Sequence, residues 1–107
     1  MLYKFKSAAA GDLIMLEPNG RRVLEVMGKD AGPTGIILPE HMQSAMHALT
    51  TAVSQEEAEQ QTAIDQAKSK GEIPPRFEAV SLRKRAWPLV EMLQRCMKEN
   101  APITWGV

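Results

Sequence analysis

The feature that most constrains the fold is a long run of apolar residues at helical spacing in the middle of the chain. Pro39 and Glu40 suit the first turn of a helix there, because proline needs no partner for a missing N–H and a carboxylate is favoured at the positive end of the helix dipole. We expect the helix to run through the glutamates at 56, 57 and 59 and to thin out near Ala67. Spacings of three and four place the following residues on one helical face: Met42, Ala45, Met46, Leu49, Ala52 and Val53.

The two ends of the chain show the two-residue period of β-strands. Leu2–Ser7 alternates aromatic and lysine side chains, which is typical of a strand with one buried face. Asp12–Glu17 contains four consecutive apolar residues and predicts a central strand that is covered on both faces. Apolar residues alternate with small or polar ones again near the C-terminal end, which predicts a strand over Pro102–Gly106. We expect these three strands to form an antiparallel sheet.

The segment after the second strand has two interpretations. Asn19-Gly20 is typical of a hairpin turn, which would make Arg22–Met27 another strand. Alternatively, Asn19 caps a helix with apolar positions 23, 24 and 27, and Gly28 ends it. The spacing of those positions favours the helix, and Lys29–Gly35 is interpreted as a loop because it holds two glycines and a proline.

A last helix is expected to begin after Ser81, which is a good N-cap. Pro88 lies inside its apolar stripe and predicts a kinked helix, because the stripe keeps its phase across the proline. Residues 69–79 are rich in glycine, proline and charge and predict a flexible connection. The sequence therefore predicts a single α+β domain over residues 1–107, with a small three-stranded antiparallel sheet packed with three helices. The stripe of the last helix consists of Leu82, Ala86, Leu89, Val90, Leu93 and Met97.

Charge and cysteine content bear on the partners and the compartment. The 107 residues carry a formal net charge of zero, so no overall field attracts the chain to nucleic acid or to an anionic membrane. Residues 39–79 are acidic and residues 80–107 basic, and the two patches either face each other or solvate the surface. Cys96 is the only cysteine, Asp12 interrupts any N-terminal signal-peptide core, and no apolar run approaches the ~20 residues that cross a bilayer. We therefore expect a soluble, cytoplasmic protein.

Six segments spread over the chain carry a family resemblance: Met1–Asp12, Leu24–Gly28, Leu38–Glu40 with the helix that follows, Val80–Leu82, Arg85–Leu89 and Thr104–Gly106. As a set they resemble an uncharacterised bacterial family, domain of unknown function 1840, with a variable stretch around Ser54–Ala79. The resemblance implies a small bacterial cytosolic protein and supports the helical interpretation of Arg21–Met27. It implies no activity, cofactor or catalytic residue.

The most unusual charged cluster is a run of three cations in the first turn after the Ser81 cap. Cations oppose the helix dipole at this position, but a helix N-terminus with free N–H groups and basic side chains suits a phosphate, a carboxylate or an acidic partner segment. The alternative is that nearby glutamates, such as Glu72 or Glu78, neutralise a solvated surface. Arg85, one turn after Ser81, either pairs with an acidic side chain of this chain or presents its planar guanidinium to an anion. The candidate anion-binding residues are Ser81, Arg83, Lys84 and Arg85.

Other reactive side chains form no recognisable site. His41 and His47 are six residues apart and face well apart on a helix, so they do not form a metal-binding pair. Cys96 lies on the apolar side of its helix and is expected to be a buried structural thiol. Trp87 and Trp105 are expected in the core or an interface. No catalytic residue, metal ligand or cofactor is assigned.

The apolar strand over Asp12–Glu17 suggests a sheet face that three helices do not cover, and we expect a homodimer to cover it. The candidate interface residues are Leu13, Met15 and Trp105. The sequence thus favours a non-catalytic interaction or accessory protein. The alternative is a small anion- or nucleotide-binding module at the start of the last helix. An enzyme ranks last, because no nucleophile with a base and no glycine-rich phosphate loop is present, and nucleic acid is disfavoured as a partner.

Overall fold

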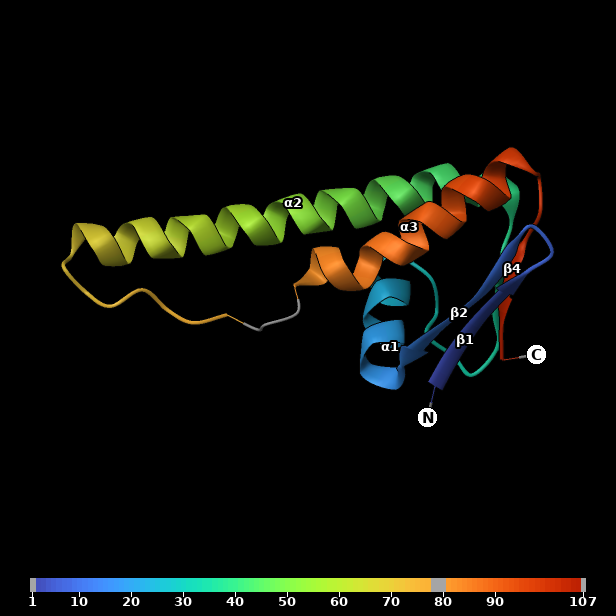
Figure 1. Cartoon of the computed structure of the whole chain (residues 1–107), viewed down its shortest axis with the longest axis horizontal. Coiled ribbons are helices and arrows are strands. Elements are labelled where there is room, and N and C mark those ends of the chain that lie inside the picture. The colour runs from blue at the N-terminus through green and yellow to red at the C-terminus, as the bar shows by residue number, and fades with distance from the viewer. Residues whose placement is uncertain (1, 78–80, 107) are drawn as a thin grey trace.

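An antiparallel sheet with helices packed on one of its faces organises the chain (Figure 1). The computed structural model describes residues 2–77 and 81–106. The elements follow in the order β1 (Leu2–Ser7), β2 (Ala10–Leu16), α1 (Glu17–Val26), β3 (Gly35–Ile37), α2 (Pro39–Ser69), α3 (Leu82–Lys98) and β4 (Ile103–Trp105).

The sheet has four strands in the order β2-β1-β4-β3, with every neighbouring pair antiparallel. The α+β class and the antiparallel sheet are confirmed, whereas the prediction of three strands is wrong. The missing strand is β3, which lies at one edge and has only three residues. So short a strand has no alternation to detect, and it follows a segment whose glycines and proline indicate a loop.

Helix α1 confirms the helical interpretation of the segment after β2, although it begins earlier than expected. Its first residue is Glu17, Pro18 lies in its first turn, and Asn19 lies inside the helix instead of capping it. The start fits elementary preferences, because proline and an acidic residue are both favoured in a first helical turn. Gly28 ends the helix as expected, with a positive φ of 79°.

Helix α2 confirms the long amphipathic helix and extends it to Ser69. Its 31 residues span about 46 Å at 1.5 Å per residue, nearly the 53 Å length of the molecule. The first half packs on the core, but of residues 54–69, all of which the structure describes, Ala67 alone is buried. The second half of α2 therefore projects beyond the sheet and the other helices (Figure 1).

Helix α3 begins where the sequence predicts. The Ser81 hydroxyl accepts a hydrogen bond from the backbone N–H of Lys84 at 3.3 Å, which confirms the N-cap. The helix continues through Pro88 as one element, and a kink at that proline stays a prediction. Five of the six stripe residues are buried, and Met97 is partly buried. Most of α3 runs beside α2, and its inner face also contacts β2.

A single core lies between the sheet and the helices. Trp105 on β4 is buried, and its indole N–H donates to the carbonyl oxygen of Gly32 at 3.1 Å. This bond ties the segment before β3 to the centre of the sheet. The largest fully buried side chains are Phe5, Leu24, Ile37, Met42, Leu49, Leu89, Leu93 and Ile103.

Candidate functional site

The basic run at the start of α3 is divided between two sides of the helix. Arg83 turns toward α2, whereas Lys84 and Arg85 line a hollow beside β2. The four candidate anion-binding residues therefore do not surround one point in space. Ser81 satisfies a backbone N–H of the helix itself.

Arg83 is held by Glu57 of α2 in a two-pronged contact. Its Nε and Nη2 atoms donate to the two carboxylate oxygens of Glu57, both at 2.9 Å. The guanidinium carbon also lies 5.3 Å from the centre of the Trp87 ring, a cation–π arrangement. The hydrogen bond from Arg83 lowers the pKa of Glu57 below its ordinary value, and the same bond raises the pKa of Arg83. Both side chains are about half exposed, so this pair is a surface contact of modest strength.

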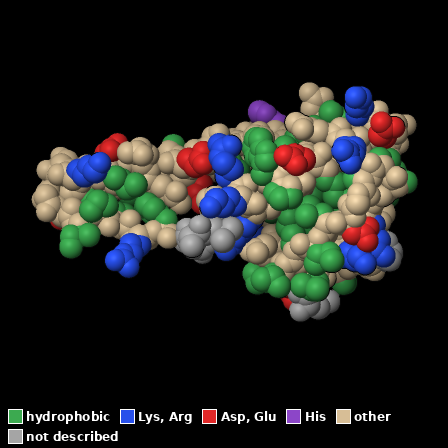
Figure 2. Space-filling model, in the orientation of Figure 1, with side chains coloured by type: hydrophobic (Ala, Val, Ile, Leu, Met, Phe, Trp, Pro, Cys, Tyr) green, Lys and Arg blue, Asp and Glu red, His purple; other side chains and the backbone are tan. Residues whose placement is uncertain are grey.

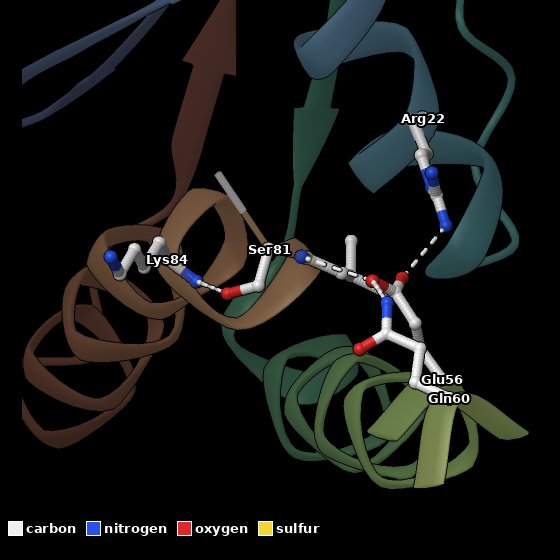
Figure 3. Close-up of polar contacts among 6 residues, drawn as sticks. Arg22, Glu56, Gln60, Ser81 and Lys84 are labelled. Carbon is white, nitrogen blue, oxygen red and sulfur yellow. Dashed lines mark hydrogen bonds and ion pairs between the residues drawn. The ribbon is translucent and has the colours of Figure 1, made fainter. Parts of the chain in front are cut away.

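A second glutamate of α2 faces the first turn of α3 (Figure 3). Glu56 accepts hydrogen bonds from Arg22 of α1 at 3.1 Å, from Gln60 at 3.2 Å and from the backbone N–H of Leu82 at 3.5 Å. Its side chain is only 23% exposed. A carboxylate at a helix N-terminus satisfies a free N–H and interacts favourably with the dipole. The chain thus supplies its own anion to the start of α3.

Neutralisation by glutamates was one of the two expectations for the basic run, but the residues differ from those expected. The acidic partners are Glu56 and Glu57, which precede the run by about 26 positions. The ion pairs that the structure describes do not include Glu72, and Glu78 lies outside the described residues. Helix pairing brings these carboxylates to α3, and local sequence gives no direct sign of it. The acidic character of residues 39–79 beside a basic end is the one available signal.

The outer edge of β2 and the first half of α3 enclose a hollow of about 290 Å³. Consecutive residues of the strand, Leu13 to Leu16, form one wall. Lys84, Arg85 and Pro88 form the other wall, and Asn19 also lines the hollow. Figure 2 shows hydrophobic side chains gathered in this region, with lysine and arginine side chains around the beginning of α3.

The sheet face that points away from the helices carries exposed aliphatic side chains. Leu2 pairs with Leu16 and Lys4 with Ile14, so these residues share one face of β1 and β2. Thr104 of β4 pairs with Lys6 and with Ile36, which places Ile36 on the same face. The exposed aliphatic residues of this face are Leu2 (60%), Ile14 (55%), Leu16 (62%) and Ile36 (44%).

The three interface candidates lie on the opposite, helix-covered face. Met15 and Trp105 are buried in the core. The prediction of a central strand is wrong, because β2 lies at an edge of the sheet and leaves Leu13 only partly buried. A strand exposes alternate residues, so the apolar run of β2 supplies both faces. The open face is therefore lined by Ile14 and Leu16 from that run and not by the candidates.

The remaining candidates occupy ordinary positions. His41 and His47 are exposed on α2, and Cys96 is fully buried as expected. Trp87 is 38% exposed, so it does not lie in the core. In residues 2–77 and 81–106, no three histidine, cysteine or acidic side chains gather as they would around a metal ion. Within the same ranges, the structure holds no helix both long enough and apolar enough to cross a membrane.

These features define a class of small α+β proteins in which a four-stranded sheet is covered by helices on one face and open on the other. A family model described as a domain of unknown function, DUF1840, matches residues 1–105. The chain belongs to this family, which confirms the resemblance seen in the sequence. Searches among curated proteins and among solved structures gave no match.

Proposed function

We propose that the chain is a non-catalytic interaction protein of the bacterial cytoplasm that associates with a second copy of itself through the open face of the sheet. The observation that carries this proposal is the group of four exposed aliphatic residues on that face. Patches of this kind, on a surface that the chain's own helices leave uncovered, commonly mark an interface. The compartment rests on the family resemblance and on the lone, buried Cys96.

Charge supports a second copy as the occupant of this face. The open face carries Lys4 and Asp12 in an ion pair at 3.4 Å, together with Lys6, so both signs of charge border the aliphatic group. A two-fold arrangement brings the same patch against itself and allows a lysine of one copy to meet Asp12 of the other. The net charge of zero means that two copies do not repel each other.

The experiment is a measurement of molar mass by light scattering at micromolar concentration. We expect twice the 11.8 kDa mass of the chain. The double variant Leu2→Lys, Ile36→Lys places charge at both ends of the patch and should shift the mass to that of one chain. Both side chains are exposed, so we expect far-UV circular dichroism and thermal unfolding to show a folded protein.

Ile73→Lys is the matched control, because Ile73 is the most exposed of the large hydrophobic residues and lies in the connection before α3, outside the sheet. It should leave the dimer intact. A wild-type protein that scatters as a single chain at 100 μM would contradict the proposal.

A further inference from the structure

We propose that the hollow between β2 and α3 binds an extended acidic peptide segment of another protein, which adds as a fifth strand to the free edge of β2. The inference goes beyond self-association, because it concerns the edge of the sheet and not its open face.

The two edges of the sheet differ in how open they are to strand addition. Strand β3 has three residues and lies between Pro33 and Pro39, which limits any pairing along its outer side. Strand β2 has seven residues and contains no proline or lysine, and its one charged side chain, Asp12, is paired with Lys4. Among residues 2–77 and 81–106, β2 pairs with β1 alone, so alternate residues direct backbone N–H and C=O groups away from β1. The geometry therefore favours β2 as the edge that accepts a strand.

Space for the added strand continues along β2. The hollow beside Leu13 to Leu16 meets a second one, of about 210 Å³, at Pro88, which lines both. The second hollow is lined by Ala10 of β2 and by Glu91 and Arg95 of α3. The two hollows lie beside the two ends of β2, whose seven residues span about 23 Å, and Gly11 and Asp12 between them line neither. A peptide of about seven residues matches this length.

The charges along the α3 side of the hollows favour an acidic peptide as the occupant. The α3 side of the two hollows carries the cations Lys84 and Arg95 against one carboxylate, Glu91. The ion pairs of the described residues include neither Lys84 nor Arg95. A second copy that paired β2 with β2 would bring two such cationic walls together, which is unfavourable. A segment with glutamate or aspartate at alternate positions places its carboxylates beside the cations while its backbone pairs with β2.

The test uses a fluorescein-labelled, end-capped heptapeptide of alternating glutamate and valine, with anisotropy as the readout. We expect saturable binding that weakens strongly between 0.05 and 0.5 M sodium chloride, because salt screens the contacts with the cations. The same peptide with alternate backbone nitrogens methylated should not bind, because strand addition needs those N–H groups. A lysine–valine heptapeptide should bind at least about tenfold more weakly, since its charges meet like charges.

The decisive variant is Lys84→Glu. It places a glutamate three residues after the Ser81 cap, where a carboxylate favours the helix, so the variant should fold at least as stably as the wild type. We expect it to weaken peptide binding about fivefold to tenfold, from the loss of one exposed ion pair and the gain of one repulsion. Lys68→Glu, at an exposed position near the end of α2, makes the same change of charge and should leave binding unaltered.

This proposal would be overturned by no binding of the acidic peptide at 1 mM, by equal binding of the N-methylated peptide, or by equal binding by the Lys84→Glu and Lys68→Glu variants. If the double variant Leu2→Lys, Ile36→Lys is monomeric and still binds the peptide, the edge and the open face act separately. If Lys84→Glu abolishes the dimer, a second copy occupies the edge of β2, and the acidic-peptide proposal fails. These outcomes distinguish a failure of the peptide-binding proposal at the edge of β2 from a failure of the dimer proposal at the open face.

Discussion

The contact between Glu56 and the start of α3 leads to the sharpest prediction about stability. Glu56→Ala removes the ion pair with Arg22, in which the arginine is about half exposed, and such a pair contributes about 0.2–1 kcal/mol. It also removes the acceptor for the N–H of Leu82. That loss costs about 0.5–1 kcal/mol, at the low end for helix caps, because 3.5 Å is a long hydrogen bond. We expect the free energy of unfolding to fall by about 0.7–2 kcal/mol.

The assay is urea unfolding followed by circular dichroism, with thermal unfolding as a second measure. An unfolding entropy of about 2.1 cal/mol/K per residue gives about 0.22 kcal/mol/K for 107 residues, so the melting temperature should fall by about 3–9 °C. Glu56→Gln keeps an acceptor for the N–H but loses the charge, and it should cost about half as much.

Glu59→Ala is the matched control for this prediction. Glu59 lies on the same helix and is exposed, and the ion pairs of the described residues do not include it. The change in helix propensity and in net charge is the same as for Glu56→Ala, so the difference between the two variants isolates the contacts of Glu56. If the two variants were equally stable, the carboxylate would contribute nothing to the start of α3, and the reasoning would be refuted.

Three further predictions concern other contacts of the fold. The pKa of Glu57 is lowered in the folded state, so its stabilising contribution is present above the ordinary pKa and is lost as pH falls through the lowered value. The free energies of unfolding of wild type and Glu57→Gln, measured in urea, should therefore converge from about pH 5 toward pH 3. A difference that does not change with pH would contradict this. Gly35→Ala should destabilise the fold by about 1–3 kcal/mol in the same assay, because the added Cβ would overlap the buried Trp105 ring. Gly32→Ala should cost far less, because no atom lies nearer than 3.8 Å to the position of its added Cβ. Cys96 should react with a thiol reagent only after unfolding, and rapid reaction of the native protein would be inconsistent with its burial.

The parts of the fold that the sequence predicts are those determined by local, repeated preferences. The apolar stripes of α2 and α3 extend over several turns, and the Ser81 cap acts on an N–H only three residues away. Strand β3 has three residues and is held by pairing with β4, about 68 positions later in the chain. Its identity as a strand depends on that distant partner and not on its own sequence.

The candidate site shows the same limit. The sequence identifies the basic run as unusual. Glu57 contacts Arg83 and Glu56 contacts the backbone N–H of Leu82, and both carboxylates come from another helix, about 26 positions earlier, which residue spacing does not encode. The apolar run of β2 likewise indicates two apolar faces but not which face the helices cover. The register with β1 decides this, because Phe5 and Tyr3 are buried opposite Leu13 and Met15.

The most direct test of the account is a map of contacts between copies of the chain. A sample that mixes protein labelled with ¹³C at isoleucine and leucine methyl groups with unlabelled protein reports, in isotope-filtered NOE spectra, only contacts between different copies. The account predicts such contacts from the methyl groups of Leu2, Ile14, Leu16 and Ile36. Contacts confined to other residues, such as the exposed Ile73, or no contacts at all at millimolar concentration, would contradict the open sheet face as the interaction surface.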